Sequence, residues 1–268
     1  MTWQLAAVAT EAALRAGAIQ KERYGQELQI DYKGETDLVT EVDRACEGVI
    51  LETIRARFPD HDIVTEESVF AQTGARHVWF IDPLDGTVNF AHGYPFFCAS
   101  VGVARDGQVV AGAVYDPIKE ELFTAERGAG AHLNGRRLRV SRSTQLIKSL
   151  LVTGFPYDVR DDLQAKLRWF NRLMGQARAV RRDGSAALDL CYVGAGRFDG
   201  FWEERLNTWD MVAGNLVVEE AGGRVSRFDG TAIGLAHDEI LATNGGIHEA
   251  MMEVLQAAGA PGRAAGWP

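Results

Sequence analysis

Residues 79–90 constrain this chain most, because an apolar run stops there at two aspartates three residues apart. Such a run is typical of a buried strand, and a strand that ends at Ile81 would deliver Asp82 to the edge of a sheet. Pro83 would prevent a simple continuation of the strand, and Gly86 would let the backbone approach a ligand closely. The stretch therefore predicts a metal and phosphate site at a sheet edge.

Composition excludes several classes of protein. With 268 residues, 46% of them hydrophobic, the chain can bury roughly 75% of its unfolded surface, as an ordinary globular domain does. Asp and Glu outnumber Lys and Arg by 37 to 28, and no basic run is interleaved with aromatic residues, so nucleic acid is not the expected substrate. The N-terminal segment has neither a signal peptide's apolar core nor a membrane-spanning length, which predicts a cytoplasmic protein without membrane contact.

The three cysteines argue against a disulfide framework and against a thiolate zinc site. Cys46, Cys98 and Cys191 are odd in number and far apart, and none belongs to a CxxC pair. Buried, reduced thiols are therefore expected.

The first half of the chain predicts a mixture of helices and meandering strands. Apolar residues at helical spacing predict helices over 5–19 and 42–54, with a short strand over 28–32 between them. Further strands are predicted over 61–65 and 77–81. Asp106-Gly107 lies between two apolar segments, 100–104 and 109–115, which predicts a hairpin.

The second half alternates strand-like and helix-like segments, which predicts a layered α/β arrangement. These segments are 150–153, 163–174, 186–193, 198–202, 211–220 and 240–243. Gly222 and Gly223 follow one predicted helix as a C-terminal cap signal. We expect a single domain over 1–268, with an N-terminal half of about 1–145 and a C-terminal half of about 146–258 that meet at the active site. Residues 259–268 are expected to form a flexible tail.

The two aspartates at 82 and 85 point to bound cations. An Asp-Gly pair such as Asp85-Gly86 is also a common turn, and the chain has three others. However, unit charges 4 Å apart repel by roughly 4 kcal/mol in a protein-like dielectric, so clustered carboxylates need counterions. Oxygen ligands without a nearby His or Cys favour Mg²⁺ over zinc.

Two further carboxylates are candidates for the same site. Glu66 and Glu67 follow a predicted strand, whose period-two alternation lets only one of them face inward; a solvated pair is the alternative. Asp210 begins the predicted helix that ends at Glu220, where an aspartate can equally serve as a cap or interact with the helix dipole.

With these segments in hand, the chain resembles the inositol monophosphatase family, within the superfamily of Mg²⁺-dependent, lithium-sensitive sugar phosphatases. The resemblance spans essentially the whole chain and rests on five motifs that occur in order with suitable spacings. They are Asp37-Leu38-Val39-Thr40-Glu41-Val42-Asp43, Glu66-Glu67-Ser68, Asp82-Pro83-Leu84-Asp85-Gly86-Thr87-Val88-Asn89-Phe90, Gly184-Ser185-Ala186-Ala187-Leu188-Asp189, and Trp209-Asp210 with Glu220-Ala221-Gly222-Gly223.

The resemblance implies a layered αβαβα fold, of the α+β or α/β class, and a homodimer. It implies two to three Mg²⁺ ions and favours Glu66 over Glu67. The implied metal ligands are Glu66, Asp82, Asp85, Asp210 and the backbone carbonyl of Leu84. The implied catalytic set is Glu66 with Asp43 and Thr87, the last two orienting and helping to deprotonate the attacking water. The implied substrate-binding positions are Asp85, Gly86, Thr87, Gly184, Ser185, Glu203 and Asp210. Lys33 corresponds to a lysine that the family often has near the metals.

The expected activity is hydrolysis of myo-inositol 1-phosphate, or of a closely related sugar or polyol phosphate, by a metal-activated water. Alternatives within the superfamily are a fructose-1,6-bisphosphatase, a histidinol-phosphatase or an NADP phosphatase. A regulatory binding protein with secondary phosphatase activity is a further alternative, because fold does not fix function. The three-residue spacing of Asp82 and Asp85 does not match haloacid-dehalogenase phosphatases, which space the two acids by two.

Overall fold

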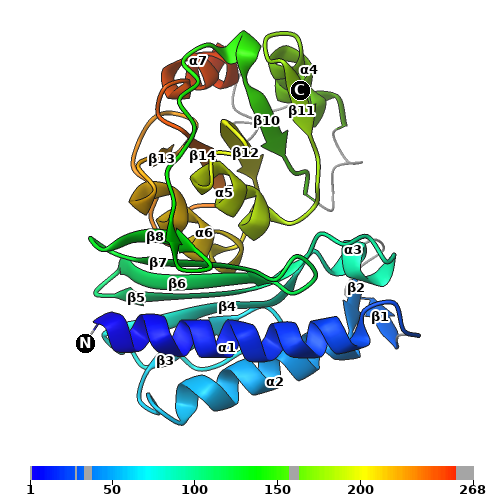
Figure 1. Ribbon diagram of the computed structural model, residues 1–268, viewed down its shortest axis with the longest axis vertical. Helices are drawn as coiled ribbons and strands as arrows, with labels where there is room; N and C mark the ends of the chain where they lie inside the picture. Colours follow the sequence, from blue (N-terminus) through cyan, green and yellow to red (C-terminus); the bar gives the residue numbers. More distant parts are fainter. Residues whose placement is uncertain (1, 28, 33–37, 157–162, 258–268) are drawn as a thin grey trace, which may run out of the picture.

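The computed structural model describes residues 2–27, 29–32, 38–156 and 163–257, which build five alternating layers of helices and sheets (Figure 1). Helices α1 and α2 cover one face of a large sheet, α5 and α6 lie between this sheet and a smaller one, and α4 and α7 cover the outer face of the smaller sheet. The helices are α1 (Thr2–Arg23), α2 (Glu41–Arg55), α3 (Thr87–Ala91), α4 (Leu163–Met174), α5 (Ala186–Gly194), α6 (Thr208–Glu220) and α7 (His248–Ala257), with a 3₁₀ turn η1 (Leu146–Lys148). Lys33 and the predicted tail 259–268 lie outside the described residues.

The large sheet has its strands in sequence order. They are β3 (Asp62–Thr65), β4 (His77–Asp85), β5 (Cys98–Arg105), β6 (Gln108–Asp116), β7 (Glu121–Glu126), β8 (Gly130–Leu133) and β9 (Arg136–Arg137). Strands β3 and β4 are parallel, and all other neighbours are antiparallel. The predicted hairpin is confirmed, since Asp106 and Gly107 both have a positive φ in the turn between β5 and β6. Strands β7 to β9 were not among the predictions.

The predicted end of the strand at Ile81 is wrong. Strand β4 continues to Asp85, and its register on β5 shifts, so that Asp82 pairs with Ser100 and Asp85 with Cys98. Two residues of β4 thus oppose one of β5 across this interval, as in a β-bulge, which accommodates Pro83 without a ladder N–H. Both aspartates therefore lie within the last four residues of β4.

The smaller sheet contains β10 (Leu150–Thr153), β11 (Ala179–Arg181), β12 (Gly200–Glu204), β13 (Arg224–Ser226) and β14 (Glu239–Thr243), in the order β11-β10-β12-β14-β13. Strand β10 is parallel to both of its neighbours, whereas β12, β14 and β13 are antiparallel. A separate two-stranded sheet pairs β1 (Ile30–Tyr32) with β2 (Leu38–Thr40). The predicted alternation of the second half is confirmed: β10 and α4 have the predicted boundaries, and the other predicted segments differ by one to three residues.

The core sits between the layers. Every residue of α5 is buried, as expected for an apolar helix between two sheets. Helix α6 lies directly on β5 and β6, where a Cβ at Gly112 would come within 2.9 Å of the Ala213 Cα. This close approach brings the first turn of α6 next to the end of β4. The three cysteines are buried and form no disulfide, as predicted.

Across the described segments, no helix is both long enough and apolar enough to pass through a membrane.

Candidate metal and phosphate site

A cavity of about 520 Å³ opens where the end of β4 meets the first turns of α3, α5 and α6. Most of the predicted site residues line it, namely Glu66, Asp85, Gly86, Gly184, Ser185, Glu203 and Asp210. Glu66, rather than Glu67, belongs to this lining. Asp43, Asp82, Leu84 and Thr87 are buried and do not line the cavity.

Four carboxyl groups interact electrostatically here: Asp82, which is buried, and three groups that line the cavity, Glu66, Asp85 and Asp210. Asp82 is only 2% exposed, and burial raises its pKa well above the ordinary value, with further increases from Glu66, Asp85 and Asp210. Burial likewise raises the pKa of Asp210, and the charges of Asp85 and Glu66 add to it. The structure thus brings all four acids close enough to affect one another's pKa values. They come from three parts of the chain: Glu66 directly follows β3, Asp82 and Asp85 lie on β4, and Asp210 lies on α6.

Local hydrogen bonds orient the aspartates of this cluster. Asp82 Oδ1 accepts the Leu84 N–H at 3.0 Å. Asp85 Oδ2 accepts the Ser185 hydroxyl at 2.6 Å and the Ala187 N–H at 2.7 Å, which joins β4 to the first turn of α5. Asp210 Oδ2 accepts the Asn207 N–H at 2.6 Å in a capping box. Asp210 is therefore a helix cap and a member of the acidic cluster at once.

The chemistry of this cluster fits Mg²⁺, although the side chains are not arranged as a finished metal site. Within the described ranges, no three acidic, His or Cys side chains are grouped closely enough to hold a metal ion as they stand. Each hydrogen bond above uses a single carboxyl oxygen, and the donor set consists only of hard oxygen ligands.

Asp43 and Thr87 are in direct contact. The Thr87 Oγ1 lies 3.1 Å from Asp43 Oδ1 and 2.9 Å from the Leu84 carbonyl oxygen, and its single proton can serve one of them at a time. Asp43 closes the capping box of α2 by accepting the N–H and hydroxyl of Thr40. Burial raises the pKa of Asp43 to about 6, against the opposing effect of the Thr40 hydrogen bonds.

Two glycines shape the phosphate side of the cavity. Gly86 has a φ of 94° and opens α3 without a side-chain cap, and a Cβ there would lie 2.9 Å from the Phe96 carbonyl oxygen. Gly184 has a φ of 89° and would place a Cβ 3.1 Å from the Asn89 amide. The residue before α3 is thus Gly86, and neither Thr87 nor Asn89 caps this helix with its side chain. Both glycines are required by backbone conformation and by close packing.

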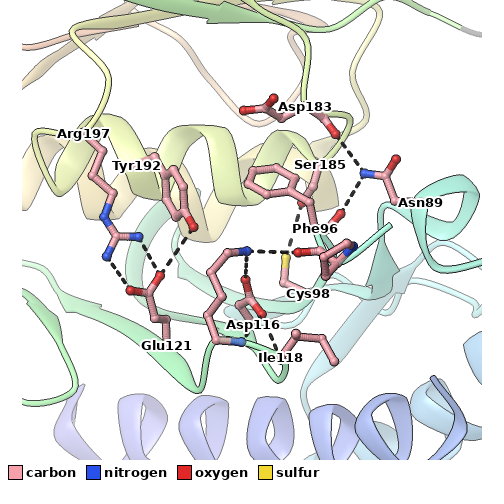
Figure 2. Close-up of polar contacts among 12 residues, drawn as sticks. Asn89, Phe96, Cys98, Asp116, Ile118, Glu121, Asp183, Ser185, Tyr192 and Arg197 are labelled. Atoms are coloured by element: carbon pink, nitrogen blue, oxygen red, sulfur yellow. Dashed lines mark hydrogen bonds and ion pairs between the residues drawn. The ribbon is translucent and has the colours of Figure 1, made fainter. Parts of the chain in front are cut away.

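Asn89 instead ties the two ends of the site together (Figure 2). Its amide nitrogen donates to the carbonyl oxygens of Phe96, at 2.7 Å, and Asp183, at 2.8 Å. These contacts hold the turn after β4 against the segment that leads into α5.

Glu203 lies on β12, lines the same cavity and is 9% exposed. Burial raises its pKa to about 8, although the nearby charge of Arg182 lowers it. Sequence reasoning assigned no role to three cavity-lining residues, Asn89, Arg182 and Asp189. A signal existed for Asp189, because it lies four residues after Ser185 and so shares a helix face with it.

Comparisons with known proteins place the chain among its relatives. The family model described as the inositol monophosphatase family matches residues 2–260. An inositol-1-monophosphatase of Synechocystis is 48% identical over 252 residues, which cover 93% of this chain and 88% of that protein. A protein of Pseudomonas aeruginosa called Nus factor SuhB is 46% identical over 234 residues, covering 85% and 86% of the two chains.

A solved structure extends the similarity to the fold. The inositol monophosphatase of an Anabaena (Nostoc) species superposes with a TM-score of 0.86 at 43% identity, covering 98% of this chain and 99% of that one. The predicted layered fold is thereby confirmed. This chain belongs to the inositol monophosphatase family.

Proposed function

We propose that the protein is a Mg²⁺-dependent phosphomonoesterase that hydrolyses myo-inositol 1-phosphate or a closely related sugar or polyol phosphate. The observation that carries this proposal is the cluster of four carboxyl groups, whose burial and mutual repulsion raise the pKa values of Asp82 and Asp210. Buried like charges of this kind are tolerated when cations accompany them. Membership of the family supports phosphatase chemistry.

The side chains of Glu66, Asp82, Asp85 and Asp210, with the carbonyl oxygen of Leu84, would hold two to three Mg²⁺ ions. Bound Mg²⁺ would neutralise the phosphate, lower the pKa of the attacking water and stabilise the leaving alkoxide.

Asp43 and Thr87 would act on the attacking water. When the Thr87 hydroxyl donates its proton to Asp43 Oδ1 rather than to the Leu84 carbonyl oxygen, its lone pairs are available to accept a proton from water. A proton can then pass from the water to Thr87 Oγ1 while the Thr87 proton moves to Asp43 Oδ1. A carboxyl with a pKa of about 6 is suited to act as a base at neutral pH.

The remaining predicted residues would position the substrate. The first N–H groups of a helix have no partner inside the helix, so those of Gly86 and Thr87 would bind phosphate oxygens. The hydroxyl groups of the alcohol would be bound by five residues that line the cavity, namely Asp85, Gly184, Ser185, Glu203 and Asp210.

The direct test is release of inorganic phosphate from myo-inositol 1-phosphate by the purified full-length protein, with Mg²⁺ and with a chelator. We expect Asp82→Asn and Asp210→Asn each to lower kcat at least tenfold, which is about 1.4 kcal/mol of transition-state stabilisation. Glu219→Gln is the matched control, because Glu219 lies on the same helix as Asp210 but pairs with Arg127 outside the cavity. Wild-type rates in both asparagine variants would contradict the assignment.

A second candidate is a regulatory binding protein in which phosphatase activity is secondary, and it is favoured by the relatives that are called Nus factor SuhB. A panel of inositol 1-phosphate, fructose 1,6-bisphosphate, histidinol phosphate and NADP separates the enzymatic alternatives. A folded protein that releases phosphate from none of them favours the regulatory role. A homodimeric, cytoplasmic protein built as one domain remains part of the proposal, and analytical ultracentrifugation tests the dimer.

A further inference from the structure

Asp189 is a buried acid at the cavity for which the mechanism above has no use. It lies on α5, one helical turn after Ser185, and it is 1% exposed. Its Oδ1 atom has no hydrogen-bond partner among the described residues, although the residue lines the cavity. A buried oxygen left without a partner destabilises a fold unless something else satisfies it.

The surroundings of Asp189 form a polar wall at the alcohol end of the site. Glu203 and Arg182 line the same cavity and both act electrostatically on Asp189, Glu203 repelling its charge and Arg182 attracting it. Arg182 also acts on Glu203. The charge of one guanidinium therefore acts on two buried carboxyl groups that line the same cavity, a combination of donors and acceptors for a ligand.

The position of Glu203 depends on Gly154, which follows the neighbouring strand β10. A Cβ at Gly154 would lie 2.1 Å from Glu203 Oε1 and 2.2 Å from Oε2. A side chain at 154 would therefore occupy the space that the Glu203 carboxyl needs. Because Gly154 has no side chain, the Glu203 carboxyl fits beside it. A cavity that bound an apolar alcohol would not need a carboxyl group at this place.

We propose that Asp189 binds a hydroxyl group of the leaving alcohol, beside Glu203 and Arg182, and thereby selects polyol monophosphates over phosphates whose alcohol lacks further hydroxyls. This inference rests on the proposed function and adds a specificity-determining residue to it. A site whose buried polar groups are matched by substrate hydroxyls discriminates strongly against an analogue that leaves them unpaired. Burial raises the pKa of Asp189, so its carboxyl can both donate to and accept from a hydroxyl.

The test compares two substrates that differ in their hydroxyl groups, myo-inositol 1-phosphate and phenyl phosphate. We expect Asp189→Ala to lower kcat/KM for inositol 1-phosphate at least tenfold and to change that for phenyl phosphate less than twofold. Asp189→Asn, which still donates and accepts, should restore most of the selectivity. Asp189→Leu fills the same volume without hydrogen bonding and should behave as Asp189→Ala does, which provides a second variant if the cavity in the alanine variant impairs folding.

Asp116→Ala is the matched control for removing a buried acid. Asp116 is as buried as Asp189, but it does not line the cavity and forms an ion pair with Lys119. It should leave the ratio of the two kcat/KM values unchanged. Equal losses on both substrates in the Asp189 variants would assign a structural role to Asp189 and overturn the inference.

If the wild-type protein releases phosphate from neither compound, the proposed function fails. Calorimetric binding of inositol 1-phosphate then decides the inference, which stands if Asp189→Ala weakens binding and falls if it does not.

Discussion

The hydroxyl group of Thr87 lies between two oxygen atoms that both accept hydrogen bonds, Asp43 Oδ1 and the Leu84 carbonyl. If it relays a proton from water, Thr87→Ala should lower kcat at least tenfold, about 1.4 kcal/mol, with a smaller effect on the Mg²⁺ concentration at half-maximal activity. Thr87→Ser keeps the hydroxyl and is the control. A loss confined to Mg²⁺ affinity would assign Thr87 to metal binding instead.

His248 provides a pH-dependent contribution to stability outside the site. It is fully buried, its ring nitrogens lie 2.9 Å from the hydroxyls of Ser226 and Thr243, and burial lowers its pKa to about 4. Between that value and the unfolded value of about 6.5, the unfolded chain binds more protons, so stability falls as the pH is lowered through this window.

We expect His248→Gln to reduce the difference between the free energies of unfolding at pH 7 and pH 5, as measured by urea titration. The control is His92→Gln, at an exposed position. An unchanged pH dependence in His248→Gln would mean that other groups produce it.

Single acidic residues show what the sequence could and could not decide. Alternation along the strand established that only one of Glu66 and Glu67 faces inward, but not which, because both follow the last paired residue of β3. From the sequence, Asp210 could be either a helix-capping residue or a member of the acidic cluster. In the structure it is both, since it accepts a hydrogen bond from Asn207 N–H and interacts with Asp85 and Glu66. A carboxyl group has two oxygens, so one can cap a helix while the other faces a cavity.

The loop between β3 and β4 begins with Glu66 and is held by an anchor that the sequence did not indicate. The carboxylate of Asp62 accepts hydrogen bonds from the N–H groups of Thr73, Gly74 and Ala75 and from the Thr73 hydroxyl. These hydrogen bonds lower the pKa of Asp62, so its contribution to stability is present above pH 4 or so and is lost as the pH falls further.

Asp62→Asn should loosen this loop and reduce activity, because the amide can accept with only one oxygen. We expect faster hydrogen exchange at residues 73–75 and a lower kcat, with little change in the rest of the protein. Asp106→Asn is the control at the same end of the loop, where Asp106 forms an exposed ion pair with Arg76 that contributes little. If hydrogen exchange at residues 73–75 is unchanged in Asp62→Asn, Asp62 does not anchor this loop.

The elements themselves followed from periodicity, except where the chain departs from regular pairing. The helices around Val42 and Ala186 were predictable because their apolar spacing matches a helical face. The extension of β4 past Ile81 was not, because a bulge depends on the partner strand, which the sequence of β4 does not contain. Long-range contacts also explain why Arg182 and Asp189 were missed, since their proximity to Glu203 arises only in the folded chain.

The acidic cluster joins parts of the molecule that are far apart in sequence. Glu66, Asp82 and Asp85 adjoin the large sheet, whereas Asp210 belongs to α6, and the pKa of Asp82 is raised by all the others. Because burial in the folded chain raises the pKa values of Asp82, Asp85 and Asp210, the folded protein binds more protons than the unfolded chain, and metal-free stability falls as the pH rises above about 4. Cations that bind the cluster should reverse this loss and connect the layers.

We therefore expect Mg²⁺ to raise the Tm of the full-length protein, and to raise it more at pH 8 than at pH 5, in calorimetry against a chelator-treated sample. At a hundred times its Kd, a ligand that binds only the folded state adds about 2.7 kcal/mol of stability. Asp210→Asn should remove most of this increase, because it withdraws the ligand that α6 contributes, while Glu219→Gln on the same helix should retain it. An equal Mg²⁺ response in Asp210→Asn and the wild type would mean that Mg²⁺ binds elsewhere, and a larger response at pH 5 would mean that protonation of these carboxyl groups does not compete with the cation.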